Sequence, residues 1–467
     1  FRFVRASLSA EFTFFSQFPA ASVKPRPFPK ATTNLAASFP MFNYAHGKSR
    51  GNPLGDGSAV MPLKTDGGTL YDFNFHYTDP KEIVVNGEYP AGHTLILGKT
   101  GTGKTVTVAA LLSFAERFNP FIFAMDKDKG LEIFIRAIGG TYFALDAGVP
   151  TGLNPFQWPD SPRLRDFLYD LVGSCVRQGH KENTAEETKQ IQMAVDTVMN
   201  LDFQYRRMGA LLHSIPPSPE ENSLLTRLEI WCGKGRFGWC FDNPSNLFNP
   251  DEFFRVGFDL TDILKTNYRP TEPLLACLFY MKNIMLDRVA KTRSALFTVV
   301  EEFWLPASYP TTARFILDGL KTDRKLGGLL VLPTQSPKDA INSPIFDTVV
   351  EQTVTKILLP NPAAEYEGNY SRIGLTEKEF REMARLGEKS RTFLVKQNMG
   401  SSLAKLNLQG MDEEIAVLSG NAANVHIMHE AMKSCGSEKP DDWLPVFQQM
   451  RREAHTRQKK AESLPTA

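Results

Sequence analysis

The chain has 467 residues, with 53 Lys and Arg residues against 52 Asp and Glu residues, so its formal net charge is +1. Hydrophobic residues make up 42% and charged residues 22% of the sequence, which excludes a long disordered chain, a collagen-like chain and a disulfide scaffold. The balanced charge argues against a surface that wraps nucleic acid uniformly. The length predicts two or three structural units, and no apolar run is long enough to span a bilayer.

Residues 1–90 are rich in Pro, Gly, Phe and Asn, which break any helical pattern. Short alternating runs such as TLYDFNFHY (69–77) predict edge strands. The aromatic start of the chain lacks the continuous aliphatic core of a signal peptide. We interpret residues 1–90 as a β-rich connector that follows a missing N-terminal domain.

The pattern changes to alternating strands and helices in residues 91–157. An apolar run, HTLILG (93–98), precedes a Gly-rich turn and a helical pattern, VTVAALLSFAERF (106–118). Two further strands are predicted in NPFIFAMDKDKG (119–130) and GGTYFALDAG (139–148). Strand, helix and strand in this order predict an α/β fold with a parallel sheet, of which residues 91–157 form the first part.

Residues 158–250 are predicted to form a helical subdomain inserted into this core. RLRDFLYDLVGSCVRQ (163–178) and AEETKQIQMAVDTVMN (185–200) both repeat apolar residues at helical spacing. Strand patterns resume afterwards, so residues 251–437 form the second part of the core, and residues 438–467 a polar C-terminal tail. The strand-like runs of this second part are 253–260, 294–304, 327–337, 353–360 and 390–399, and its strongest helix is 271–289.

The five cysteines are scattered along the chain, at Cys175, Cys232, Cys240, Cys277 and Cys435. None belongs to a CxxC pair, and their number is odd. This usage predicts free, buried thiols in a reducing compartment.

The strongest local signal is a phosphate-binding loop that matches G-x-x-x-x-G-K-[ST] at every required position. Its residues are Gly98, Lys99, Thr100, Gly101, Thr102, Gly103, Lys104 and Thr105. Glycines let the backbone N–H groups converge on phosphate oxygens, and the following helix directs its N-terminus at the same anion. Lys104 is then placed to reach the β and γ phosphates, and Thr105 to bind Mg²⁺. The alternative is a chance Gly-rich turn, and Lys99 alone is expected to be solvated.

A second acidic strand, LFTVVEEFW (296–304), supplies the carboxylates that a phosphate loop requires. Glu301 at the strand tip is predicted to hold Mg²⁺ through water, and Glu302 to orient and deprotonate the attacking water. The alternative is an acidic pair on the surface. Asp126 and Asp128, in MDKDKG (125–130), either line the same site or belong to an ordinary polar loop.

Two further residues are candidates for sensing or completing the nucleotide site. Gln335, in LPTQSP (332–337), follows the next strand and is predicted to sense the γ phosphate, unless the segment is a simple turn. Arg324 and Lys325 lie in KTDRKLGG (321–328), between a helix and a strand. One of them is predicted to reach a neighbouring subunit's nucleotide as an arginine finger, the alternative being a solvated surface cation.

Several longer stretches resemble the C-terminal ATPase domain of the CagE/TrbE/VirB family, the traffic ATPases of bacterial type IV secretion and conjugation. The resemblance extends from about residue 10 to residue 420 and rests on FAMDKDKG (123–130), TGLNPF (151–156), GKGRFGWCFDNPSN (233–246), VGFDLTDIL (256–264), EEFW (301–304) and DRKLGGLLVLPTQSP (323–337). It implies a RecA-like core with an inserted helical subdomain. It also implies ATP hydrolysis with Mg²⁺ that powers pilus biogenesis and the translocation of DNA or protein.

The same resemblance implies a hexamer or related ring at the cytoplasmic face of the inner membrane, in contact with other secretion components. It assigns nucleotide roles to Gly98, Gly103, Lys104, Thr105, Glu302 and Gln335, and a contact in trans to Arg324. The family usually has Asp-Glu where this chain has Glu301-Glu302, so the metal geometry must adjust to a side chain that is one methylene longer.

Two other classes of protein remain open. A DNA-pumping ATPase of the coupling-protein or FtsK/HerA type would carry basic residues that contact DNA, and RREAHTRQKK (451–460) is the clearest basic stretch here. That stretch is also typical of a solvated helix end. A scaffold that binds nucleotide without turnover is the other class, and its support is the Glu301 departure.

Overall fold

The structure is a computed structural model, and it describes residues 10–22, 31–33, 45–77, 90–179, 181–335, 337–397 and 400–462. Parts of the predicted connector, residues 1–9, 23–30, 34–44 and 78–89, lie outside this description. The chain divides into two compact units, Phe1–Ala45 and His46–Ala467. The first unit contains helix α1 (Ala10–Phe15), and the second contains every other element described below.

The core of the second unit is an eleven-stranded sheet of order β2-β1-β11-β10-β9-β3-β8-β7-β4-β6-β5. The strands are β1 (Met61–Thr65), β2 (Leu70–Phe73), β3 (Thr94–Leu97), β4 (Phe121–Asp126), β5 (Thr141–Ala144), β6 (Arg255–Asp259), β7 (Leu296–Val300), β8 (Gly328–Thr334), β9 (Thr355–Leu358), β10 (Thr392–Gln397) and β11 (Gly400–Lys405). From β9 to β5 all neighbours are parallel, whereas β2, β1, β11, β10 and β9 pair antiparallel. The predicted α/β fold with a mainly parallel sheet is confirmed.

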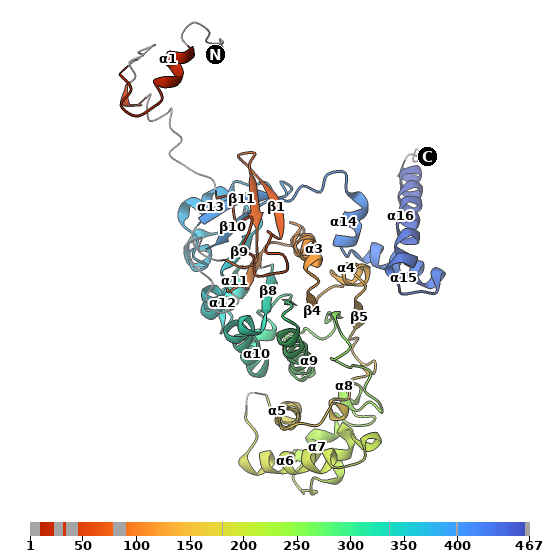
Figure 1. Cartoon of the computed structure of the whole chain (residues 1–467). Helices are drawn as coiled ribbons and strands as arrows, with labels where there is room; N and C mark the ends of the chain where they lie inside the picture. Colours follow the sequence, from red (N-terminus) through yellow and green to blue (C-terminus); the bar gives the residue numbers. More distant parts are fainter. Residues whose placement is uncertain are drawn as a thin grey trace. The chain divides into compact units, whose positions relative to one another are not determined.

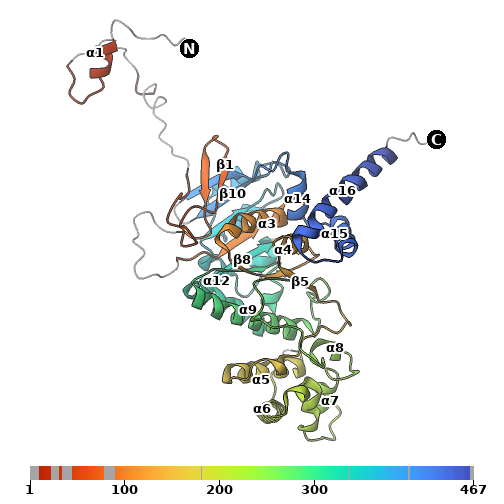
Figure 2. The same ribbon diagram turned by 45° about the vertical axis from the view of Figure 1, so that its right-hand side comes forward.

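Helices cover both faces of the parallel part because the chain crosses it in two directions. From β3 the chain moves through α3 (Lys104–Ala115) to β4 and through α4 (Glu132–Ala137) to β5. After β6 it returns through α9 (Thr271–Thr292), α10 (Pro310–Thr322) and α12 (Phe346–Gln352). Right-handed crossovers in opposite directions place the two helix sets on opposite faces, in agreement with Figures 1 and 2. Every residue of β3, β4, β7 and β8 is consequently buried.

The helical block lies between β5 and β6 in sequence and extends away from the sheet (Figures 1 and 2). Its helices are α5 (Pro162–Val176), α6 (Ala185–Met199), α7 (Leu224–Glu229) and α8 (Gly238–Phe241). Ser161 caps α5, and Thr184 forms a capping box with Glu187 at the start of α6. The apolar face of α5 packs against α6 and α9, which joins the block to the core. The inserted helical subdomain is therefore present.

The remaining helices are α11 (Pro337–Ile341), α13 (Glu377–Ala384), α14 (Asp412–Leu418), α15 (Ala422–Cys435) and α16 (Pro440–Glu462). Short helical turns are η1 (Glu116–Phe118), η2 (Pro155–Gln157), η3 (Phe203–Tyr205), η4 (Met208–His213), η5 (Pro306–Ser308), η6 (Asp323–Leu326) and η7 (Tyr366–Tyr370). None of the helices within the described ranges is long and apolar enough to cross a membrane. Four cysteines are buried, and Cys435 at the end of α15 is half-buried.

Much of the stretch predicted as a polar tail forms helix α16, which has a buried apolar stripe. Trp443 and Phe447 are one turn apart and fully buried, in a small core with Ile133 of α4 and Met428 of α15. Two aromatic side chains among many charged residues suffice to dock the first turns of a helix. The side chains of residues 458–460, the end of the basic stretch, lie outside the description.

We predict that Trp443→Ala destabilises the C-terminal helices by about 3–5 kcal/mol, because it removes a fully buried indole and leaves a cavity. Urea unfolding followed by circular dichroism, together with the rate of proteolysis within α16, measures this effect. The matched control is Gln449→Ala on the exposed face of α16, which should change stability by less than about 0.5 kcal/mol. Equal stability of the two variants would contradict the packing described here.

Candidate nucleotide-binding site

The predicted site residues meet at the carboxyl edge of the parallel strands. The phosphate loop joins β3 to α3, Glu301 and Glu302 follow β7, and Gln335 follows β8. These strands are neighbours in the order β3-β8-β7, so their carboxyl ends lie side by side. A cavity of about 900 Å³ opens there and is lined by residues 99–107 together with Glu301 and Gln335.

The backbone of the loop has the conformation that phosphate binding requires. Gly101 and Gly103 have φ angles of 83° and 96°, in the left-handed region that glycine adopts without strain. The N–H of Gly98 donates to the carbonyl of Thr334 at 3.1 Å, which fixes the loop to β8. No side chain caps the N-terminus of α3, so the first amides of that helix remain available to an anion.

Lys104 is buried beside the two glutamates. Its side chain donates from Nζ to Glu302 Oε1 at 2.9 Å, and Glu301 Oε1 lies 3.6 Å from the same nitrogen. Lys104, Glu301 and Glu302 are 6%, 9% and 5% exposed. A buried ammonium group requires a counter-charge, and in this structure Glu302 is the nearer one.

Glu302 accepts further hydrogen bonds from its surroundings. Trp304 Nε1 and Thr334 Oγ1 each donate to its carboxylate at 2.9 Å, and the Gln335 amide donates at 3.2 Å. Burial alone would raise the pKa of Glu302, but the Lys104 charge and these hydrogen bonds more than offset that effect and lower its pKa below the usual value. Glu302 is therefore a carboxylate at neutral pH. Its φ angle of 49° lies in the left-handed region, which costs energy for a residue with a side chain.

Glu301 is connected to Asp126 at the end of β4. The Lys127 amide donates to Glu301 Oε2 at 3.1 Å and to Asp126 Oδ1 at 2.9 Å. Tyr142 Oη and the Leu131 amide each donate to Asp126 Oδ2 at 2.7 Å. Burial and then the nearby Glu301 charge raise the pKa of Asp126 well above its usual value. Asp126 is thus linked to Glu301 through the Lys127 amide and does not line the cavity, whereas Asp128 does.

The remaining loop residues differ in their partners. Thr100 Oγ1 donates to Gln335 Oε1, so Gln335 contacts the phosphate loop directly. Thr102 Oγ1 donates to the Lys99 carbonyl at 2.7 Å, which stabilises the turn. Lys99 forms an exposed ion pair with Glu388 at 3.6 Å, which contributes little to stability. Its solvent exposure agrees with the sequence interpretation.

Arg324 and Lys325 are not at this site in their own chain. Both are exposed in η6, immediately before β8 begins. Gln335 follows the other end of β8, so the two cations lie at the opposite edge of the sheet. Seven residues of strand separate the edges by roughly 20 Å. Neither side chain can contact a nucleotide on the loop of the same chain.

Thr105 lines the cavity with Glu301, as a magnesium site next to bound phosphates requires. Within the described part of the chain, no group of three or more His, Cys, Asp or Glu residues has the arrangement of a metal site. Mg²⁺ in phosphate-loop proteins takes most of its ligands from phosphate oxygens and water. The residues present fit such an ion only together with a nucleotide.

Sequence reasoning missed the basic residues that enter the cavity from the antiparallel strands. Lys389 and Arg391 precede β10, and Lys405 ends β11, and all three line the cavity. The run SRTFLVKQNM (390–399) is strand-like, but its apolar pattern does not reveal the strand direction. Only the antiparallel pairing of β10 with β9 shows that Arg391 lies at the nucleotide edge.

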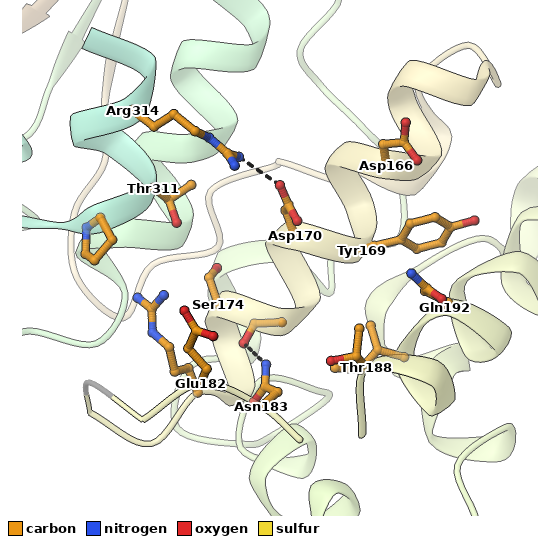
Figure 3. Close-up of a pocket in the computed structure, with 14 residues that line it drawn as sticks. Asp166, Tyr169, Asp170, Ser174, Glu182, Asn183, Thr188, Gln192, Thr311 and Arg314 are labelled. Atoms are coloured by element: carbon orange, nitrogen blue, oxygen red, sulfur yellow. Dashed lines mark hydrogen bonds and ion pairs between the residues drawn. The ribbon is translucent and has the colours of Figure 1, made fainter. Parts of the chain in front are cut away.

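A second cavity, of about 550 Å³, lies where the helical block meets the core (Figure 3). It is lined by α5, the start of α6 and the first turn of α10. Arg314 of α10 pairs with Asp170 of α5 at 2.9 Å, as the dashed line in Figure 3 shows. Arg177 pairs with Glu272 of α9, and Glu272 also accepts from the Thr311 amide at 3.1 Å. These contacts connect the helical block to α10.

The sheet, the phosphate loop and the acidic pair after β7 define a P-loop NTPase fold of the RecA-like class. No protein-family model matches the chain. Among curated proteins, the chain is 37% identical over 450 residues to the type IV secretion system protein virB4 of Bartonella henselae. It is 34% identical over 463 residues to the type IV secretion system protein PtlC of Bordetella pertussis. Each alignment covers 96% of this chain and 55% of the relative.

The chain therefore belongs to the family of type IV secretion proteins that contains VirB4 and PtlC, and the resemblance inferred from its motifs is confirmed. It spans about half the length of the curated relatives it matches. Among solved structures, VirB4 of Thermoanaerobacter pseudethanolicus matches with a TM-score of 0.60 at 19% identity, covering 77% of this chain and 99% of that one. That similarity supports the fold.

We predict that the raised pKa of Asp126 makes the folded protein less stable as pH rises. The folded state keeps a proton that the unfolded chain releases above about pH 4, so the free energy of unfolding falls by about 1.4 kcal/mol per pH unit up to the folded pKa. Glu302, whose pKa is lowered, contributes in the opposite sense and only below about pH 4.5.

Asp126→Asn should remove this slope. The measurement is the free energy of unfolding of nucleotide-free protein between pH 5 and 8 for the wild type, for Asp126→Asn and for the control Asp128→Asn. The difference between the wild type and Asp126→Asn should change with pH, and that for Asp128→Asn should not. A constant difference for Asp126→Asn would show that this carboxyl is ionised throughout.

Proposed function

We propose that this chain hydrolyses ATP and thereby energises a bacterial type IV secretion system, for pilus biogenesis and for the translocation of DNA or protein substrates. The observation that carries the proposal is the buried contact between Lys104 of the phosphate loop and Glu302 of the acidic strand. In this contact, a lysine that can bind phosphate touches a carboxylate that can act as a base, which supports hydrolysis at this point. The printed names of the curated relatives, type IV secretion system proteins, support the biological setting.

ATP lies on the Gly98–Thr105 loop, with its phosphates against the uncapped amides of α3. The triphosphate offers Lys104 more negative charge than Glu302 does, so the ammonium group turns toward the β and γ phosphates. Glu302 then loses its cation but keeps the hydrogen bonds from Trp304 and Thr334. Held in this orientation, its carboxylate positions the attacking water and accepts its proton.

The other residues of the site act on the same γ phosphate. Thr105, and Glu301 through water, would hold Mg²⁺, which when bound would neutralise part of the phosphate charge. Gln335 contacts the phosphate loop through Thr100, and its backbone amide donates to Glu302. Loss of the γ phosphate therefore changes the environment of Gln335, and through it the end of β8.

The position of Arg324 supports a role in trans. Because it lies at the edge of the sheet opposite its own phosphate loop, it can complete a nucleotide site only on a neighbouring copy. Such a head-to-tail contact repeats from copy to copy and forms a ring where the rotation closes, and we propose a hexamer or related ring. The ring associates peripherally with the cytoplasmic face of the inner membrane and contacts other secretion components.

We predict that Glu302→Gln binds ATP but hydrolyses it about 10²–10⁴-fold more slowly than the wild type, because glutamine retains the hydrogen-bond acceptor and loses the base. Phosphate release at saturating ATP measures turnover, and calorimetry measures binding. Lys104→Ala, the comparison variant, should lose affinity as well. Glu377→Gln, an exposed glutamate of α13, is the matched control. Normal turnover by Glu302→Gln would overturn its assignment as the base.

We predict that Arg324→Ala lowers turnover about 10³-fold or more in assembled protein and leaves the residual rate of monomers unchanged, because the guanidinium acts on a neighbour's nucleotide. The measurement is phosphate release across a protein concentration series, with mass determined at each point. Lys325→Ala decides which of the two cations acts, and Lys321→Ala in α10 is the exposed control. An equal loss in monomers and oligomers would contradict a role in trans.

Two measurements separate the other two classes of protein: the same concentration series, and the salt dependence of DNA binding. Turnover that stays absent in oligomers with ATP bound would favour a nucleotide-binding scaffold. Binding to DNA that weakens steeply with salt would favour a DNA-pumping ATPase.

A further inference from the structure

The antiparallel strands deliver a second cation to the phosphate loop. β10 runs opposite to β9, with Leu394 paired to Leu358, so the residues before β10 lie at the carboxyl edge of the parallel strands. Arg391 directly precedes β10, and its carbonyl accepts from the Leu406 amide at 3.1 Å, where β11 returns to the same edge. Its side chain thus enters the nucleotide cavity from the β9–β10 side of β3.

The guanidinium lies next to the N-terminus of α3. A Cβ atom built on Gly103 would lie 3.5 Å from Arg391 Nη1. Gly103 is the N-cap residue of α3, whose first amides have no side-chain cap. These amides and the guanidinium are therefore donors directed at the same space, and an anion bound there contacts both.

The electrostatics of this position favour an anion. A cation at a helix N-terminus is repelled by the helix dipole, which favours negative charge at that end. The two lysines of the phosphate loop have acidic partners, Lys104 with Glu302 and Lys99 with Glu388. No acidic side chain in the described ranges forms an ion pair with Arg391. Its charge is uncompensated where negative charge is favoured.

The backbone of Arg391 indicates a functional constraint. Its φ angle of 59° lies in the left-handed region, where glycine or asparagine is the residue that avoids strain. Strained positions of this kind cluster at ligand sites. Here the strain coincides with an exposed arginine that lines the cavity, so the side chain has a use that offsets its cost.

We propose that Arg391 binds the diphosphate part of the nucleotide, shared by ADP and ATP, from the same chain. This inference rests on the proposed function, since it assumes that the loop binds nucleotide. The γ phosphate end of the site is marked by Glu302 and Gln335, which reach the loop from β7 and β8 on one side of β3. Arg391 reaches it from β10, on the other side, and so acts on the phosphates that remain after hydrolysis.

The test is the affinity for ADP and for ATP with Mg²⁺, measured by calorimetry on the wild type, Arg391→Gly and Arg391→Lys, with turnover measured separately. Arg391→Gly should weaken both nucleotides by a similar factor of about 10–100, the effect of losing a charge-assisted hydrogen bond. The loss of affinity should exceed any loss of turnover at saturating ATP, because the γ phosphate contacts are intact. Arg391→Lys, which keeps the charge, should recover part of the affinity.

Two controls separate binding from folding. Glycine suits the backbone of position 391, so the thermal midpoint of Arg391→Gly without nucleotide should not fall. Arg385→Ala removes an exposed arginine six positions before Arg391 that pairs with Glu382, and it should leave both affinities unchanged.

Unchanged affinity of Arg391→Gly for ADP would overturn the inference. A loss of affinity confined to ATP would also overturn it, because it would place the guanidinium at the γ phosphate. A collapse of turnover with both affinities intact would overturn it too, because the guanidinium would then not contribute to nucleotide binding. If the wild type itself binds neither nucleotide, the proposed function fails as well. If Lys104→Ala weakens binding and Arg391→Gly does not, only this inference fails.

Discussion

The contact between Lys104 and Glu302 joins elements that are far apart in the sequence. Lys104 begins α3 after β3, Glu302 follows β7, and β8 lies between these strands. Both charges are buried, so removing Lys104 would leave Glu302 without its cation, at a cost of about 3–5 kcal/mol. Removing Glu302 would leave Lys104 only the more distant Glu301. The hydrogen bonds from Thr334 and Gln335 to Glu302 bring β8 into the same contact. The carboxyl ends of three strands are thus held in one arrangement, and the remaining site residues are placed relative to it.

The two edges of the sheet carry two different sets of candidate residues. The carboxyl edge of the parallel strands carries the phosphate loop, the acidic pair and Arg391. The opposite edge carries Arg324, on η6 between α10 and β8. α10 begins beside the helical block, where Arg314 meets Asp170, and ends at η6. A single covalent path therefore runs from Glu302 through α10 to Arg324 and then through β8 to Gln335.

The parts of this arrangement that the sequence predicts are those with a local signal. The phosphate loop has a fixed spacing, and β3, β4, β7 and β8 are apolar runs because they are buried on both faces. The sequence does not predict that helix α16 packs on the core, because its buried stripe consists of little more than Trp443 and Phe447. The sequence does not predict Arg391 as a site residue, because its place at the nucleotide edge depends on strand direction. That direction is decided by pairing between distant segments. The sequence predicts that Arg324 lies in a loop, but only the sheet topology shows at which edge of the sheet that loop lies.

The burial of the cysteines has a practical consequence. Burial raises the pKa of Cys175, Cys232, Cys240 and Cys277 above that of a free thiol, which suppresses the reactive thiolate. Cys435 is the fifth, half-buried at the end of α15. A maleimide dye added to the native protein would therefore label this position selectively. The unaltered chain thus provides its own attachment point for a fluorophore, next to the turn into α16, without the removal of any native cysteine.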